Sequence, residues 1–195
     1  MMPVMDGLEL TRHIRSDNRT CHIPVILLTA KSDPESKLES IQSGVDDFIT
    51  KPFSAAYLEA RIENIFLQRR LLQDKLRNDL FASKAESVIP SGNLQSQDAD
   101  FLKLIMDFME ENMSNSELTV EMLVSEAGMG RTVFFNKLKG LLGMSPIEFI
   151  KETRIKRAAE LLETGKYNVS EVSFQIGMND ARYFSKCFKL KYGVT

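Results

Sequence analysis

An internal repeat near the end of the chain constrains the fold more than any other sequence feature. Residues 120–129, VEMLVSEAGM, correspond to residues 169–178, VSEVSFQIGM, at a spacing close to 50 residues. In both copies apolar residues recur at helical spacing, and a glycine follows, Gly128 in the first and Gly177 in the second. Glycine tolerates positive φ and so permits a sharp turn into a second, crossing helix. Each copy therefore predicts a helix-turn-helix.

The helix expected after each glycine has an apolar stripe toward its partner helix and a polar stripe opposite. The apolar stripes align at an offset of 50, with Phe134, Leu138 and Gly143 matching Phe184, Phe188 and Gly193. The polar stripes follow i, i+3, i+4, i+7 spacing and consist of Thr132, Phe135, Asn136 and Lys139 in the first copy and Arg182, Ser185, Lys186 and Lys189 in the second. With the adjoining Arg131 and Ala181, these are the candidate DNA-binding residues.

The residue types in the polar stripes suit DNA recognition. Arginine can bridge two acceptors of guanine, asparagine can pair with adenine, phenylalanine can touch a thymine methyl, and lysine neutralises phosphate. A solvated polar face is the alternative for any single helix. Two aligned stripes behind glycine turns favour DNA contact over that alternative.

The charge distribution supports the same reading. The net charge is −2, but residues 131–195 carry 12 Lys/Arg against 6 Asp/Glu, while residues 1–130 carry 13 against 21. Phosphate neutralisation needs local positive charge, so a basic end on an acidic chain is typical of a DNA-binding domain joined to another unit.

A single helix is predicted between the copies, from Pro146 to about Glu163, with proline at its start. Eighteen residues at a rise of ~1.5 Å span ~27 Å. This approaches the 34–36 Å turn of B-DNA, so the two recognition helices could enter successive major grooves.

The N-terminal part alternates helix and strand signals. A helix capped by Asp6 precedes an apolar strand over residues 23–29; a helix from Asp33 ended by Gly44, a strand over 47–50 and a helix from about Ala55 follow. This order predicts the second half of a doubly wound α/β domain, with the other half expected before Met1. We therefore expect a partial α/β domain over residues 1–70, a helical extension and linker over 71–97, and an all-α domain with two helix-turn-helix units over 98–195.

The helix over residues 61–80 carries two interpretations. Its apolar positions, Ile62, Ile65, Leu72 and Leu76, are interrupted by Arg69. The spacing allows a short coiled coil that pairs two copies of the chain, or an amphipathic helix lying on its own domain. Residues 83–97 lack periodicity and are expected to form an exposed linker.

Neither a cofactor nor a metal is expected. Cys21 and Cys187 lack ligand spacing, and His13 and His22 belong to no nucleophile–base constellation, so we expect no enzyme activity. No apolar run approaches the ~20 residues of a membrane span, which predicts a cytoplasmic chain without membrane contact.

The segment from about Leu118 to Thr195 resembles the AraC-type DNA-binding domain. The resemblance rests on Gly128-Met-Gly-Arg131, Phe135-Asn-Lys-Leu-Lys139, Gly143-Met-Ser-Pro146, residues 154–162 (RIKRAAELL) and residues 177–186 (GMNDARYFSK). It implies a transcription regulator that contacts DNA through the stripes above. Val124 and Ser173 stand where that family usually has alanine.

Residues 1–53 resemble the second half of a response-regulator receiver domain. The blocks that match are MPVMDG at 2–7, PVILLTA at 24–30, GVDDF at 44–48 and KPF at 51–53. The resemblance implies a switch made of the Thr29 hydroxyl, the Phe48 ring and the Lys51 ammonium, with a cis Lys51–Pro52 peptide. It also implies that the phosphorylated aspartate and the magnesium-binding acidic pair precede Met1, so we expect no phosphate acceptor here; Asp6 matches a helix cap instead.

A receiver followed by an AraC-type domain is similar to the C-terminal end of hybrid two-component regulators. We therefore expect a sequence-specific transcription regulator whose partner is double-stranded DNA. RNA polymerase and a second copy of the chain, bound through residues 61–80, are further candidate partners. The competing hypothesis is a signalling and dimerisation fragment with only non-specific DNA binding.

Overall fold

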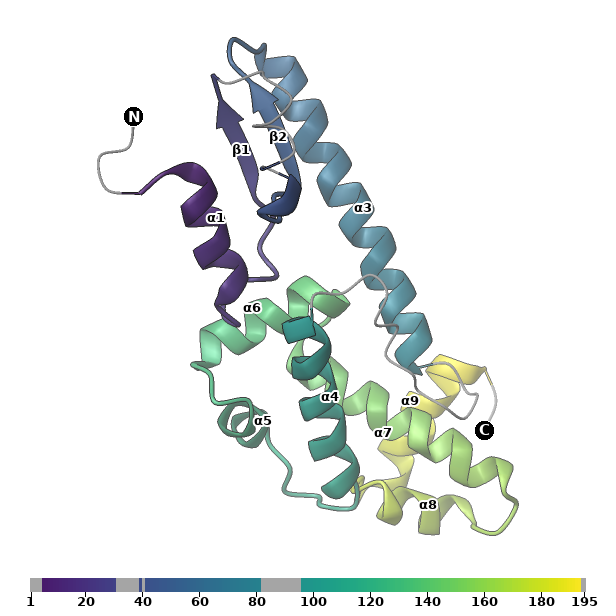
Figure 1. Cartoon of the computed structure of the whole chain (residues 1–195). Coiled ribbons are helices and arrows are strands. Elements are labelled where there is room, and N and C mark those ends of the chain that lie inside the picture. The colour runs from purple at the N-terminus through teal and green to yellow at the C-terminus, as the bar shows by residue number, and fades with distance from the viewer. Residues whose placement is uncertain (1–4, 31–38, 40, 82–95, 194–195) are drawn as a thin grey trace. The chain divides into compact units, whose positions relative to one another are not determined.

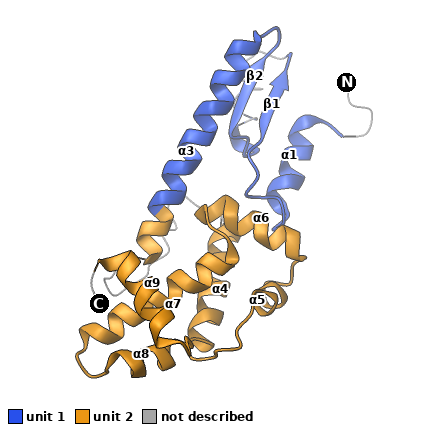
Figure 2. Cartoon of the chain, turned by 180° about the vertical axis from the view of Figure 1, so that it is seen from behind, with its two compact units in different colours: residues 1–75 blue, residues 76–195 orange. Residues whose placement is uncertain are grey.

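The computed structural model describes residues 5–30, 39, 41–81 and 96–193. The chain divides into two compact units, residues 1–75 and residues 76–195 (Figure 2). Most of the helix expected from Asp33 and of the linker expected over 83–97 lies outside the described residues. The last two residues of that predicted linker are helical, because α4 begins at Ser96 with Asp98 in its first turn, where negative charge favours a helix start.

The first unit contains a helix and a two-stranded parallel sheet (Figure 1). Helix α1 (Gly7–Ser16) begins after Asp6, whose carboxylate accepts a hydrogen bond from the Glu9 N–H at 2.8 Å, which confirms the predicted cap. Strands β1 (Ile26–Thr29) and β2 (Asp47–Thr50) pair in parallel, with Ile26 opposite Asp47 and Thr29 opposite Thr50. The α/β character expected of this region is therefore confirmed.

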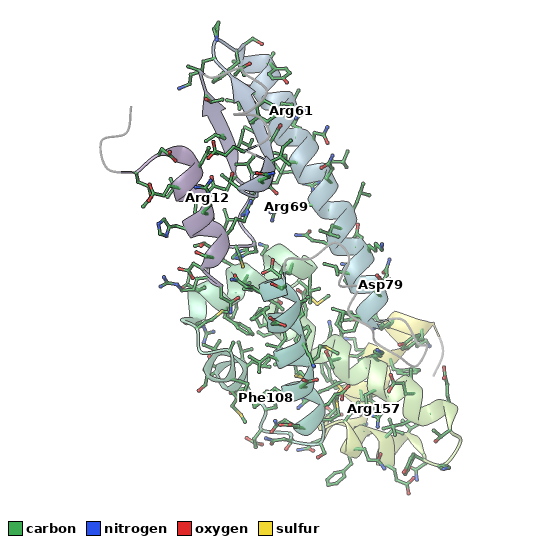
Figure 3. The ribbon with its side chains drawn as sticks, viewed as in Figure 1. Arg12, Arg61, Arg69, Asp79, Phe108 and Arg157 are labelled. Carbon is green, nitrogen blue, oxygen red and sulfur yellow. The ribbon has the colours of Figure 1, made fainter. Side chains whose placement is uncertain are left out.

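Helix α3 (Ala55–Phe81) follows the sheet and extends over 27 residues. Arg61 and Arg69 project from it (Figure 3): Arg61 makes a two-pronged ion pair with the buried Asp47, and Arg69 donates to the His22 carbonyl and lies 3.5 Å from Asp46. Because Arg69 bonds to residues of its own unit, the Arg69 face of α3 lies against that unit. For that face of α3, this agrees with the second interpretation of the sequence, an amphipathic helix that lies on its own domain.

The second unit is helical. It comprises the last residues of α3 together with α4 (Ser96–Glu111), α5 (Val120–Glu126), α6 (Arg131–Leu142), α7 (Pro146–Glu163), α8 (Val169–Gln175) and α9 (Ala181–Tyr192). The all-α domain is therefore confirmed, and its two short-helix and long-helix pairs, α5–α6 and α8–α9, follow the sequence repeat. The two pairs lie on either side of α7 along the chain.

The central helix α7 contacts α6 on one side and α8 and α9 on the other, and it also packs against the end of α3. Its Phe149 is fully buried and meets the Phe81 ring edge-on at 6.2 Å, while Ile155 and Ala158 pack in one cluster with residues of α8 and α9 (Val172, Ile176 and Phe184). The helix begins with a capping box, in which the Ser145 hydroxyl accepts from the Glu148 N–H and the Glu148 carboxylate accepts from the Ser145 N–H. A helix shared in this way connects the two helix pairs.

Two negative findings concern the described part of the chain alone. No described helix is long and apolar enough to cross a membrane. Among the same residues, no group of three or more His, Cys, Asp or Glu side chains is placed to hold a metal ion.

Candidate nucleic-acid interface

The two glycine turns have the geometry that the repeat predicts. Gly128, after α5, has φ of 61° and Gly177, after α8, has φ of 68°. Thr119 caps α5 and Asn168 caps α8 through side-chain oxygens that accept N–H groups three residues on. Each short helix is thus defined at both ends, and the chain re-enters a longer helix directly after the turn.

On α6 the predicted polar stripe is exposed. Thr132, Asn136 and Lys139 are exposed, and Phe135 is half-buried. Arg131 pairs with Glu121 of α5, and its guanidinium carbon lies 5.1 Å from the Phe135 ring centroid. Because DNA phosphate would compete with that exposed carboxylate for Arg131, the ion pair does not remove this residue from a DNA interface.

On α9 the equivalent stripe has the same character. Arg182, Lys186 and Lys189 are exposed, whereas Ala181 and Ser185 are half-buried. The Ser185 hydroxyl donates to the Ala181 carbonyl at 2.8 Å, so in this conformation its oxygen is available as an acceptor rather than a donor. This stripe therefore carries three long cations beside one small hydroxyl.

The opposite faces of both helices pack against the core, as the aligned apolar stripes predict, although Phe188 of α9 is only half-buried. Phe134 and Leu138 of α6 are 0% exposed, and Phe134 meets Phe101 of α4 edge-on at 5.7 Å. Phe184 of α9 is 1% exposed and stacks with Phe188 at 5.7 Å. Each helix is thus fixed by its apolar face and leaves its polar stripe to solvent.

Helix α9 is further held to α7 by charge. The Lys191 ammonium lies 2.6 Å from the Glu152 carboxylate and also 5.3 Å from the Phe81 ring centroid. On the same helix, a hydrogen bond with Cys187 raises the pKa of Tyr183. Cys187 is a half-buried free thiol.

Sequence reasoning missed the most deeply buried charge of the unit. Lys137 of α6 is 0% exposed, and its ammonium lies 2.8 Å from the carboxylate of Asp98 in the first turn of α4. A signal was available, because Lys137 follows Phe134 by three residues and precedes Leu141 by four, which places it on the apolar face. Lysine is so rarely fully buried that the residue type alone favours an exposed side chain at this position.

The three residues expected to form a receiver switch lie on or beside the sheet. Thr29 ends β1, Phe48 is half-buried in β2, and the exposed Lys51 follows β2. The Lys51 N–H donates to the Thr29 carbonyl at 2.7 Å, so the two residues lie at the same edge of the sheet. The Lys51–Pro52 peptide is cis, as predicted.

Two protein families match separate parts of the chain. Residues 123–195 match a helix-turn-helix domain family, and residues 1–63 match the response regulator receiver domain family. Both matches agree with the resemblances in the sequence. They assign the two units to DNA-binding and signalling families rather than to enzyme families.

Similar proteins include kinases and regulators. The protein named "Histidine kinase P4" from Formosa agariphila is 42% identical over 196 residues, which covers all of this chain but 14% of that protein. "Transcriptional regulatory protein GltR" from Pseudomonas aeruginosa is 30% identical over 183 residues, covering 85% of this chain and 66% of that protein. In a solved structure, the C-terminal domain of the two-component response regulator yesN from Fusobacterium nucleatum aligns with 49% of this chain and 99% of that one, at 25% identity and a TM-score of 0.45.

Proposed function

Because this chain joins part of a response-regulator receiver domain, over residues 1–63, to an AraC-type helix-turn-helix domain over residues 123–195, we propose that it reads specific DNA sequences for a two-component system. Helices α6 and α9 enter successive major grooves on one face of the duplex. The observation that carries this proposal is the pair of matching polar stripes on two helices whose opposite faces pack against the core.

The proposed roles of the stripe residues follow from their chemistry. Arg182 reads guanine through its two-pronged guanidinium, and Asn136 reads adenine through its amide. Lys139, Lys186 and Lys189 neutralise phosphates and set the register of the helices. Helix α7, which spans ~27 Å, holds the two half-sites about one helical turn apart.

The direct test is selection from random duplexes followed by fluorescence-anisotropy titration at two salt concentrations. We expect a bipartite site, and we expect Arg182→Ala to lose ~1–3 kcal/mol of discrimination, about 5- to 150-fold, in one half-site alone. Lys103→Ala is the matched control, because it removes one exposed positive charge from α4, outside both stripes.

Weak, salt-sensitive binding without sequence preference, equal for wild type and Arg182→Ala, would contradict the proposal. It would favour the competing signalling and dimerisation fragment. A general loss of affinity in Lys103→Ala as large as that in Arg182→Ala would show that net charge, rather than base recognition, accounts for the effect.

We also propose that residues 61–80 pair two copies of the chain. The support is an exposed face of α3 roughly opposite Arg69, where Leu67 and Leu71 are 58 and 62% exposed. Analytical ultracentrifugation should then show a dimer that Leu67→Glu with Leu71→Glu dissociates. The sedimentation coefficient of a monomer at every concentration would contradict this pairing.

The receiver part would supply the signal. We propose that Thr29, Phe48 and Lys51 act as its switch, because a hydroxyl and an ammonium at adjacent strand ends suit a phosphoryl group. The relative named "Histidine kinase P4" is a kinase by its name, and this chain matches 14% of the length of that protein. In a longer protein with a phosphate acceptor, Thr29→Val should leave DNA affinity insensitive to phosphorylation.

A further inference from the structure

A buried ion pair connects the first recognition helix to α4. Lys137 of α6 is 0% exposed, and its Nζ lies 2.8 Å from Oδ1 of Asp98, whose side chain is 6% exposed. The same ammonium lies 5.0 Å from the Phe101 ring centroid, and Phe101 packs edge-on against Phe134 of α6. The charge is thus enclosed between two helices rather than displayed toward solvent.

Such a pair is poorly explained by stability alone. Removing both charges from water costs about as much as their attraction returns, so apolar side chains of similar size often serve stability equally well. An ion pair differs from apolar packing in having a direction, because the ammonium and carboxylate must meet at hydrogen-bonding distance. The specific effect of the ion pair is therefore to fix how α6 and α4 are positioned relative to one another.

The position of Lys137 on α6 makes that geometry relevant to DNA. At ~100° per residue, Lys137 lies roughly 150° around the helix from the centre of the stripe that contains Thr132, Asn136 and Lys139. Side-chain ends lie ~5–6 Å from a helix axis, so a rotation of ~20° moves them by ~2 Å. That displacement exceeds the tolerance of a hydrogen bond to a base edge.

We propose that the Lys137–Asp98 ion pair is the positioning contact that sets the rotation of α6, and thereby the base contacts of the first half-site. This inference rests on the proposed DNA-reading function. Asp98 lies in the first turn of α4, where the helix N-terminus stabilises negative charge and the carboxylate is held in place.

The second recognition helix provides an internal control. At the repeat offset of 50, the residue that matches Lys137 is Cys187 of α9, a half-buried thiol that hydrogen-bonds to Tyr183. Helix α9 is held instead by Phe184 in its core and by the partly exposed Lys191–Glu152 pair. Loss of the buried pair should therefore impair one half-site and spare the other.

The test compares the full chain with the double variant Lys137→Met with Asp98→Leu, which replaces the pair by apolar side chains of similar size. Urea denaturation establishes that it folds, and site selection reports discrimination in each half-site. The α6 half-site is the half-site in which Asn136→Ala reduces discrimination. We expect the double variant to lose ~10-fold discrimination in that half-site and to change discrimination by less than ~2-fold in the other.

Asp98→Glu provides a second, milder variant, because it keeps a carboxylate to pair with the buried Lys137 ammonium and lengthens the side chain by one methylene. We expect this variant to lose less discrimination in the α6 half-site than the double variant loses. If the double variant does not fold, this variant alone provides the test. Undiminished discrimination in the α6 half-site of a folded variant would overturn the inference alone, as would equal loss in both half-sites. A wild-type chain that selects no site would overturn the proposed function, and this inference with it.

Discussion

The two turn glycines offer a matched pair of substitutions. Gly128 and Gly177 occupy equivalent places in the two helix-turn-helix units and have nearly equal φ, 61° and 68°. Their surroundings differ. A Cβ at Gly128 would meet nothing within 4 Å, whereas a Cβ at Gly177 would lie 2.9 Å from Nη2 of Arg154 and 2.9 Å from the Met113 carbonyl oxygen.

The expected costs follow from these distances. An alanine with positive φ lowers the free energy of unfolding by ~1–2 kcal/mol at either position. Alanine also reduces the conformational entropy of the unfolded chain, which offsets part of this loss equally at both positions. At Gly177 the Cβ must also displace a backbone carbonyl and a guanidinium that donates to the Asn115 carbonyl at 2.6 Å. Overpacking of this kind adds ~1–3 kcal/mol, so Gly177→Ala should lose about 1–3 kcal/mol more than Gly128→Ala.

Urea denaturation of the full chain, followed by far-UV circular dichroism, measures the free energy of unfolding of each variant. Peptides from α7 and from residues 112–119 should show faster hydrogen exchange in Gly177→Ala alone, because the displaced groups of Arg154, Met113 and Asn115 lie there. Equal losses of stability in the two variants, within ~0.5 kcal/mol, would refute the reasoning from close packing.

Three further predictions concern other parts of the second unit. Phe149→Ala should cost ~3–5 kcal/mol in urea denaturation, because the ring is fully buried and meets Phe81; a loss below ~1 kcal/mol would contradict this packing. Lys189→Ala should reduce the slope of log K against log[salt] by about 1 if Lys189 binds phosphate; an unchanged slope would exclude that contact. Hydrogen bonds from the Ser145 N–H and hydroxyl lower the pKa of Glu148. The ionised Glu148 carboxylate should therefore stabilise the fold fully above the ordinary glutamate pKa of about 4.3, and this stabilisation should be lost as the pH falls through the lowered pKa of the folded chain. The stability difference between wild type and Glu148→Gln should therefore shrink in acid; a difference that grows would contradict the assignment.

Much of the helical unit follows from local sequence. The repeat predicts both helix-turn-helix units, because glycine at positive φ and apolar spacing are properties of short segments. The same holds for the cap at Asp6 and for the long helix that begins with Pro146. In each case the residues that decide the outcome lie within a few positions of one another.

The exposed stripes on α6 and α9 were also predictable, since an amphipathic helix must bury its apolar face and expose the other. Periodicity could not decide between the two interpretations of residues 61–80. Arg69 looks like an interruption in the sequence, and only its bonds to the His22 carbonyl and Asp46, residues far earlier in the chain, show which face of α3 lies inward.

The sequence by itself determined the helices of the second unit, their glycine turns and the two polar stripes, because these depend on local conformational preference and helical period. The tertiary structure decided which partners cover the buried faces. It paired Lys137 with Asp98 and packed Gly177 against the Met113 carbonyl, neither of which a spacing of residues reveals. Helical period reports that a face is covered, whereas the identity of the covering group depends on contacts between residues distant in the chain.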